Sequence, residues 1–205
     1  DTLSLHDALP ICVYTVPVSE LPGARGDGSP LTSFVNLASG SQMVAYYAGQ
    51  ADDLVLLSTK AGYGFLANVS DMSTRNKAGK SFLSMDAKVP GDAPLGAAKV
   101  QVGMKQVACL SEASKLLVFP LDELKRLPTG GKGVILMGLD DKEFLASAIA
   151  VGPNGATYAG AGRAGKPTEL NLDAKTLKSF AGNRARKGHF VEPRLKDGKL
   201  KANSV

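Results

Sequence analysis

The sequence predicts an all-β fold, a propeller-like array of repeated blades with about four strands each. Short apolar runs recur along the 205-residue chain between turns rich in glycine and proline, a pattern typical of all-β proteins. A short cationic loop that ends in glycine also recurs. Its closing glycines are Gly28, Gly79, Gly133 and Gly188, which stand 51, 54 and 55 residues apart in the numbering. A period near ~50 residues is typical of arrays whose neighbouring blades bury each other's faces.

The expected strands follow the apolar runs in order. Leu21–Pro30 is predicted to be a loop, because its prolines and glycines suit neither a helix nor a central strand. Leu121–Arg126 is the one plausible helical turn. The strands are expected at Val13–Val16, Leu31–Leu37, Gln42–Tyr47, Leu54–Ser58, Tyr63–Asn68, Ser81–Met85, Ala97–Val102, Gln106–Leu110, Lys115–Phe119, Val134–Met137, Leu145–Val151, Thr157–Ala159 and Glu169–Leu172, with a last run from Phe190. Each cycle thus runs through strands, a short turn, a basic loop and further strands.

Three parts are expected along the chain. Residues 1–12 are interpreted as an unstructured, non-native leader, because D-T-L-S-L-H-D-A-L-P-I lacks an initiator Met and looks like a translated sequencing adapter. Residues 13–192 form the β array of about four blades, incomplete on its N-terminal side. Residues 193–205 are expected to be a basic C-terminal tail.

Charge is distributed unevenly along the chain. Residues 163–205 hold 11 Lys/Arg against 4 Asp/Glu, whereas the remainder holds 13 against 15. A basic end on a near-neutral body indicates an anionic partner there, or simply a solubilising tail. The two cysteines form no C-x-x-C motif, so no zinc site is predicted. No apolar stretch approaches the ~18–20 residues of a membrane span, and a soluble, cytoplasmic protein is expected.

The basic loops are the candidate binding site. Lysine and arginine neutralise phosphates, and glycine-rich backbone can approach a phosphate closely. One such loop alone is more often a solvated turn, but four at a regular period favour a track for a DNA backbone that is not sequence-specific. The alternative is a protein-interaction module that binds an acidic partner. The candidate DNA-binding residues are Arg25, Arg75, Lys77, Lys80, Lys132, Arg184, Arg186 and Lys187.

Other motifs carry less weight. Gly160–Gly165 matches G-x-G-x-x-G, yet the alternating run T-E-L-N-L follows it where a dinucleotide-binding motif must open a helix. A glycine-rich hairpin between Tyr158 and Leu170 is expected instead. His189 lacks a nucleophile or carboxylate at any family spacing, so no catalytic constellation is predicted. A free-standing enzyme is therefore the weakest hypothesis.

Several blocks resemble one family. V-Y-T-V at 13–16, L-P-G-A-R-G-D-G-S-P-L at 21–31, A-G-Y-G-F at 61–65, R-N-K-A-G-K at 75–80, L-L-V-F-P-L-D-E-L at 116–124 and R-A-R-K-G at 184–188 resemble the C-terminal domain of the topoisomerase IV A subunit. That domain is similar to the C-terminal domain of the gyrase A subunit. The resemblance spans about residues 13–191. The gyrase box Q-R-R-G-G-K-G is absent, which favours topoisomerase IV.

The resemblance implies a β-pinwheel, in which blades exchange strands and a basic rim bends duplex DNA. It also implies that this chain lacks a cofactor site, since ATP and Mg²⁺ belong to other domains or subunits of an ATP-dependent topoisomerase. The parent enzyme would relax supercoils and unlink chromosomes, would have the B subunit of topoisomerase IV for its partner, and would act at the nucleoid. A chromosome-organising protein is a further candidate partner.

Overall fold

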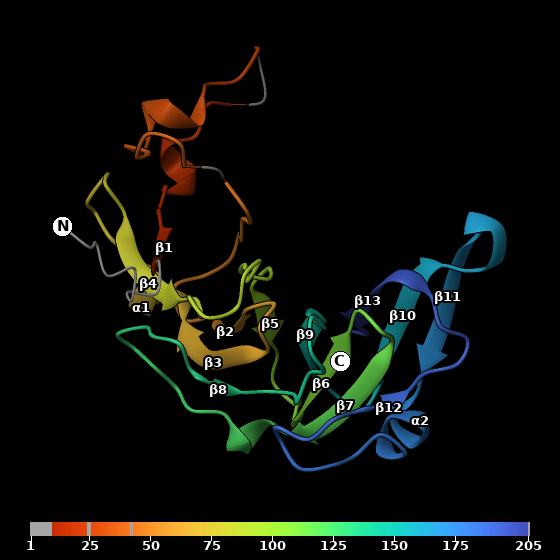
Figure 1. The fold of residues 1–205 in the computed structure, drawn as a ribbon. Helices are drawn as coiled ribbons and strands as arrows, with labels where there is room; N and C mark the ends of the chain where they lie inside the picture. The colour runs from red at the N-terminus through yellow and green to blue at the C-terminus, as the bar shows by residue number, and fades with distance from the viewer. Residues whose placement is uncertain (1–9, 24–25, 42, 205) are drawn as a thin grey trace.

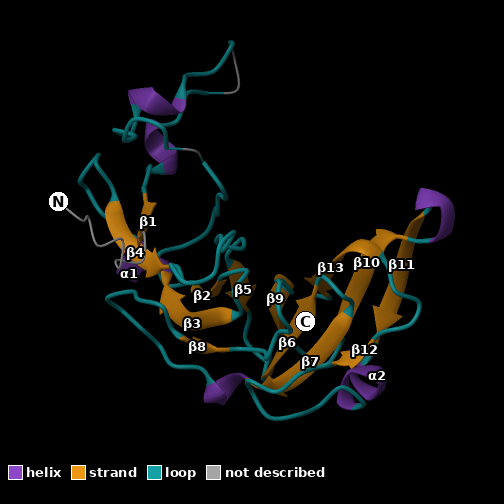
Figure 2. Ribbon diagram, in the orientation of Figure 1, coloured by secondary structure: helices purple, strands orange, loops and turns teal. Residues whose placement is uncertain are grey.

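The computed structural model describes residues 10–23, 26–41 and 43–204, and its regular secondary structure is mainly β-strand, joined by long loops (Figures 1 and 2). The strands are β1 Pro10–Val13, β2 Leu54–Ser58, β3 Tyr63–Asn68, β4 Lys80–Ser84, β5 Ala98–Val100, β6 Gln106–Ser111, β7 Lys115–Pro120, β8 Val134–Ile135, β9 Leu145–Val151, β10 Ala156–Ala161, β11 Pro167–Leu172, β12 His189–Phe190 and β13 Lys196–Ala202. The helices are short: η1 Val18–Glu20, η2 Leu31–Ser33, α1 Val69–Met72, η3 Leu121–Glu123, η4 Arg163–Gly165 and α2 Ala174–Lys178. None of these helices is long and apolar enough to cross a membrane.

The strands form four sheets that follow one another around an open arc (Figure 1). Their strand orders are β1-β4, then β5-β2-β3-β8, then β9-β6-β7-β12, then β13-β10-β11. In the figure, β5, β9 and β13 lie toward the inside of the arc, and β8 and β12 lie toward its outside. The predicted all-β, propeller-like fold is confirmed.

Neighbouring sheets exchange one strand. The chain runs from the hairpin β6–β7 through η3 to β8, yet β8 pairs with β3 of the preceding sheet, with Val134 opposite Gly64. In the same way β12 follows the hairpin β10–β11 but pairs with β7, with His189 opposite Leu116. β4 pairs with β1. Each sheet is therefore completed by the cycle that follows it, as a β-pinwheel requires.

The core lies between successive sheets, and strand alternation explains it. On β6, Val107 and Cys109 pack toward the second sheet, while Ala108 and Leu110 pack toward the fourth. Successive side chains of a strand point to opposite faces. A strand buried on both faces must therefore be apolar throughout, which is why β2, β6 and β7 read as continuous apolar runs rather than alternating ones.

Most expected strands are present. Those at 54–58, 63–68 and 145–151 match β2, β3 and β9 residue for residue. Three of these strand predictions were wrong. Of Val13–Val16, only Val13 lies in a strand, as the last residue of β1. Leu31–Leu37 begins with the 3-10 turn η2, and no strand occurs in the described part of Gln42–Tyr47, since Gln42 itself lies outside the described residues. Both of these runs have the sequence of strands, but neither is paired in a described sheet.

Strands also extend beyond both expected ends of the domain. β1 begins at Pro10, before the expected boundary at Val13, because Ile11 and Cys12 pair with Leu83 and Ser81 of β4. Residues 193–205 are not a tail in the structure, because Lys196–Ala202 forms β13 and pairs with β10. In β13, Gly198 and Leu200 are buried while the lysines point outward. The lysines of this alternating strand are what made it resemble a tail.

Candidate nucleic-acid interface

Three of the four basic loops, those closed by Gly79, Gly133 and Gly188, occupy the same place in their cycles. Each follows a short helix and leads into the strand that is exchanged with the preceding sheet: α1 to β4, η3 to β8 and α2 to β12. In Figure 1 these three connections run along the outside of the arc, away from the inner strands β5, β9 and β13. We call them the first, second and third rim loops, with the cationic parts at 75–79, 129–133 and 183–188.

Backbone hydrogen bonds attach the second and third rim loops at equivalent positions of the preceding cycle. Gly131 N–H of the second loop donates to Phe82 C=O at 2.8 Å, and Ala185 N–H of the third loop donates to Leu136 C=O at 3.0 Å. Phe82 and Leu136 each stand three residues after a closing glycine. The spacing read from the sequence therefore corresponds to a spatial repeat.

Two of the closing glycines, Gly133 and Gly188, are required because the loop backbone lies very close to the backbone of the preceding sheet. A Cβ on Gly133 would lie 2.2 Å from Gly64 C=O oxygen, and one on Gly188 would lie 2.5 Å from Leu116 C=O oxygen. Both distances are far shorter than van der Waals contact. Gly64 and Leu116 are the residues of β3 and β7 that receive the exchanged strand. Glycine at this point lets the rim loop turn tightly onto the edge of the preceding sheet.

The first rim loop presents two cations to solvent. Arg75 and Lys77 are exposed, and no acidic side chain within the described residues forms an ion pair with either. The loop is shaped by Asn76, whose side-chain oxygen accepts from Ala78 N–H at 3.0 Å. Lys80 is half-buried, and its Nζ donates to Asp71 C=O at 2.7 Å. Its charge is thus held against the protein.

The second rim loop holds a single cation that is already engaged. Lys132 Nζ lies 2.8 Å from Asp86 Oδ2 and 4.0 Å from the centre of the Tyr63 ring. Partial burial opposes its charge, but the hydrogen bonds to Asp86 and Tyr63 outweigh that effect and raise the pKa of Lys132. The hydrogen bond from Lys132 in turn lowers the pKa of Asp86.

The third rim loop contains cations that are engaged by protein groups as well as one that is not. Lys187 forms an ion pair with Asp140, which is also paired with Lys115. Hydrogen bonds from Lys115 and Lys187 lower the pKa of Asp140 to about 2. Arg184 donates from Nη1 to Ile135 C=O at 2.5 Å, and its Nε lies 3.9 Å from Glu123 Oε2.

Arg186 of the same loop is different. Its side chain is exposed and makes no ion pair with any residue that the structure describes. Only its backbone is engaged, since Arg186 C=O accepts from Gly138 N–H at 3.0 Å.

The ion pairs of the second and third loops follow one rule. Asp86 and Asp140 each stand seven residues after a closing glycine, and Lys132 and Lys187 each stand immediately before the next one. Each aspartate therefore fastens the rim loop of the following cycle. Sequence analysis missed these aspartates, although the period that identified the glycines also contains them.

The structure thus divides the predicted DNA-binding residues. Arg75, Lys77 and Arg186 are exposed and unpaired within the described residues, whereas Lys80, Lys132, Arg184 and Lys187 are engaged by protein groups. Arg25 lies outside the described residues. The seven described candidates therefore lie in or directly beside the three rim loops, and four of them are engaged by protein groups.

Comparison with known proteins agrees with this architecture. The family model described as DNA gyrase C-terminal domain, beta-propeller, matches residues 53–89 and 105–151. The A subunit of DNA topoisomerase 4 from Neisseria gonorrhoeae is 31% identical over 176 residues, covering 84% of this chain. Its counterpart from Pseudomonas aeruginosa is 32% identical over 181 residues, covering 86% of it.

The chain belongs to the family formed by the C-terminal domains of the gyrase and topoisomerase IV A subunits. It spans 23% of the length of the two curated relatives. The solved C-terminal domain of Escherichia coli ParC shares the fold, with a TM-score of 0.75 and 22% identity over 92% of this chain and 76% of that one. A DNA gyrase A C-terminal domain shares it with a TM-score of 0.63 and 18% identity, over 80% of this chain and 52% of that one.

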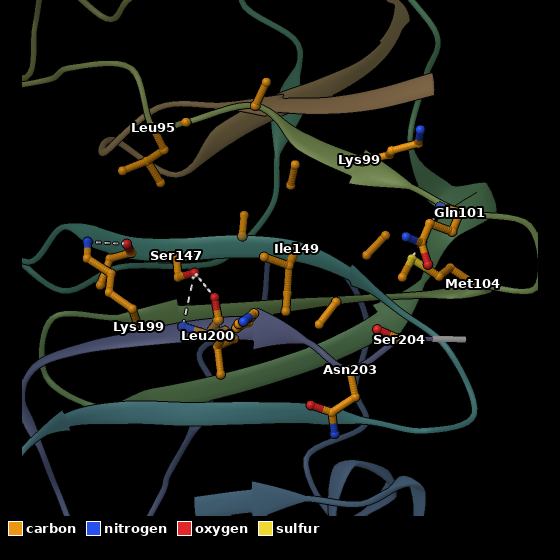
Figure 3. Close-up of a pocket in the computed structure, with 18 residues that line it drawn as sticks. Leu95, Lys99, Gln101, Met104, Ser147, Ile149, Lys199, Leu200, Asn203 and Ser204 are labelled. Carbon is orange, nitrogen blue, oxygen red and sulfur yellow. Dashed lines mark hydrogen bonds between the residues drawn. The ribbon is translucent and has the colours of Figure 1, made fainter. Parts of the chain in front are cut away.

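The inner side of this family member holds a cavity of about 500 Å³ between β5, β9 and β13. Figure 3 shows Lys99, Met104, Ile149 and Lys199 around it. Lys99 is paired with Asp53 at 2.6 Å, and Lys199 Nζ donates to Ala146 C=O at 2.6 Å. Two of its lysines are thus held by the fold, and the cavity lies on the side opposite the rim loops.

The glycine-rich hairpin predicted between Tyr158 and Leu170 is present, as β10 and β11. Gly160–Gly165 lies in the β10–β11 hairpin, where Gly162 N–H donates to Lys166 C=O at 2.8 Å and η4 forms the tip. The motif leads into a strand and opens no long helix, so it cannot act as a dinucleotide-binding turn. No group of three or more potential metal ligands occurs in the described part of the chain.

Proposed function

We propose that this domain binds duplex DNA along its outer rim, through phosphate contacts from Arg75, Lys77 and Arg186. The observation that carries the proposal is that these cations lie exposed and unpaired, within the described residues, on two equivalent loops of one rim. Exposed cations that share one edge can each reach a phosphate of a single duplex. Lys132, Arg184 and Lys187 add positive charge beside that path but are neutralised in part by their own acidic partners.

Binding of this kind is not specific for sequence. Phosphate contacts fix the position of a duplex without reading its bases. No long helix occurs in the described residues to enter the major groove. The curved rim suits DNA that bends around it, so sequence preference would arise from deformability of the duplex.

The names of the relatives support a wider role. Their name, which identifies each as the A subunit of DNA topoisomerase 4, describes part of a DNA enzyme. We propose that this domain positions DNA for supercoil relaxation and chromosome decatenation by a catalytic core that this chain does not contain. The B subunit would be the partner of the whole protein, and ATP and Mg²⁺ would act on other parts of it, in the bacterial cytoplasm. The matched proteins give no support for a chromosome-organising partner.

A triple substitution of Arg75, Lys77 and Arg186 to Ala tests the DNA interface. Affinity for any duplex should fall, and the slope of log K against log salt should shrink by up to ~0.9 for each phosphate contact that the substitutions remove. Fluorescence anisotropy at several salt concentrations measures both quantities. The matched control is Lys99, Lys199 and Lys201 changed to Ala, which removes the same charge from the side of the cavity. Equal losses in the two variants would refute the rim interface.

A further inference from the structure

The ion pair of the third rim loop differs in its surroundings from the ion pair of the second. Lys187 pairs with Asp140, and Lys132 pairs with Asp86, at equivalent positions of the repeat. The side chains of Lys187 and Asp140 are 65% and 45% exposed, whereas those of Lys132 and Asp86 are 38% and 14% exposed. The pair of the third loop is therefore the more open to a ligand that lies on the rim.

Asp140 has a second cation that would stay with it if Lys187 left. Lys115 Nζ donates to Asp140 Oδ2 and lies 3.0 Å from Glu143 Oε2, and the Lys115 side chain is only 12% exposed. Glu143 Oε2 also accepts from Asp140 N–H at 2.8 Å, and Asp140 C=O accepts from Glu143 N–H at 3.0 Å. Groups other than Lys187 thus hold Asp140 in place.

Asp86 has no second lysine of this kind within the described residues. Its ion pair there is with Lys132, and its other carboxylate oxygen accepts from Lys88 N–H at 3.1 Å. Lys132 is held further by the Tyr63 ring, whose centre lies 4.0 Å from Nζ. Moving Lys132 to a ligand would leave a mostly buried carboxylate without its cation, which is costly. Lys132 is therefore a fixed part of the fold, whereas Lys187 can be exchanged.

Lys187 also lies next to an exposed cation of the proposed DNA path. Arg186 precedes it in the same loop and forms no ion pair within the described residues. The loop backbone is attached without Lys187, because Arg186 C=O accepts from Gly138 N–H at 3.0 Å. A duplex that meets Arg186 brings further phosphates near Lys187, and exposed ion pairs such as the one with Asp140 are weak. The Lys187 side chain can then turn to a phosphate while the loop stays in place.

We propose that Lys187 transfers from Asp140 to a phosphate when the domain binds duplex DNA, and that Asp140 remains paired with Lys115. This inference rests on the proposed rim interface and adds to it a contact that an ion pair occupies in the free protein. The transfer leaves Lys115 between two carboxylates, those of Asp140 and Glu143. Part of the attraction of the phosphate is needed to make this change, so Asp140 is a competitor that lowers the affinity for DNA.

The first test removes the ion pair without changing the net charge. Lys187→Gln combined with Asp140→Asn in the 205-residue chain removes one phosphate contact if the pair is exchanged. The slope of log K against log salt, measured by fluorescence anisotropy, should then shrink by up to ~0.9. Lys132→Gln combined with Asp86→Asn is the matched control, because it removes the fixed pair and should leave the slope unchanged. An unchanged slope in the first variant, or equal changes in both variants, would overturn the proposal.

The second test removes the competitor alone. Asp140→Asn frees Lys187, so the affinity for duplex DNA should rise by up to about fivefold beyond the rise caused by Asp141→Asn. Asp141 is an exposed neighbour that forms no ion pair within the described residues, so its change removes the same charge without freeing a lysine. Equal rises in the two variants would overturn the exchange.

The variant that lacks the three exposed rim cations separates this proposal from the one on which it rests. If that variant loses DNA binding while Asp140→Asn gains no more than Asp141→Asn, the rim interface stands and the exchange of Lys187 is wrong. If that variant binds duplex DNA as the parent chain does, both proposals are wrong.

Discussion

The second and third rim loops share a backbone position but differ in what they offer to solvent. In both, a lysine immediately before the closing glycine is paired with an aspartate of the preceding cycle, Lys132 with Asp86 and Lys187 with Asp140. Of these two loops, only the third also carries an exposed cation that forms no ion pair within the described residues, Arg186, where the second loop has Gly131. The cations of the rim therefore have two distinct roles. One lysine in each of these loops joins successive cycles through an ion pair, and other cations remain available to bind an anion.

The first rim loop extends this comparison. Ala78 replaces the fastening lysine there, whereas Arg75 and Lys77 stand where the third loop has Arg184 and Arg186. The first loop thus has exposed cations without the ion pair, and the second has the ion pair without exposed cations. Along the path proposed for DNA, the first and third loops therefore offer cations for phosphate contacts, and the middle loop offers the fewest.

The largest expected effect comes from the backbone that the loops share. Gly133→Ala would place a Cβ 2.2 Å from Gly64 oxygen at a φ of +81°. We expect the free energy of unfolding to fall by about 3 kcal/mol, because strain and a backbone clash combine. Gly165→Ala is the matched control, since it has φ +75° with open space around it and should cost only ~1–2 kcal/mol. Urea denaturation of both variants gives the comparison, and equal losses would mean that the close approach is unimportant.

A smaller effect is expected from making the second loop resemble the third. Thr129 is exposed and stands where the first and third loops have Arg75 and Arg184. Thr129→Arg should tighten binding to duplex DNA and steepen the salt slope by up to ~0.9, because one more phosphate can be neutralised. Thr129→Gln, which adds length without charge, is the control. If Thr129→Arg left the slope of log K against log salt unchanged, the second rim loop would lie away from the DNA.

The sequence predicts the positions of the repeated strands better than it predicts which strands pair with one another. Apolar runs such as Leu54–Ser58 are bounded by turns on both sides, so local signals fix them. Strand exchange depends on pairing between residues far apart in the chain, such as Gly64 with Val134, which no local pattern specifies. Leu31–Leu37 was predicted as a strand because its local sequence is typical of one. A strand also requires a neighbouring strand to pair with, and the local sequence does not show whether one is present. Among the candidate cations, residue type alone could not separate Lys187 from Arg186, since the difference lies in the position of Asp140.

The smallest effect concerns the fastening pair itself and depends on pH. The pKa of Asp140 is lowered to about 2 in the folded protein by Lys115 and then Lys187, whereas an unfolded aspartate titrates near ~3.9. A lowered folded pKa means that the stabilisation is present above pH ~4 and disappears as the pH falls through ~2. The melting temperature of Asp140→Asn should therefore lie below that of the parent chain at pH ~6 and approach it at pH ~2. Asp141→Asn is the control, because the neighbouring Asp141 forms no ion pair within the described residues. A constant difference between Asp140→Asn and the parent across this range would show that the carboxylate fastens the loop by its shape and not by its charge.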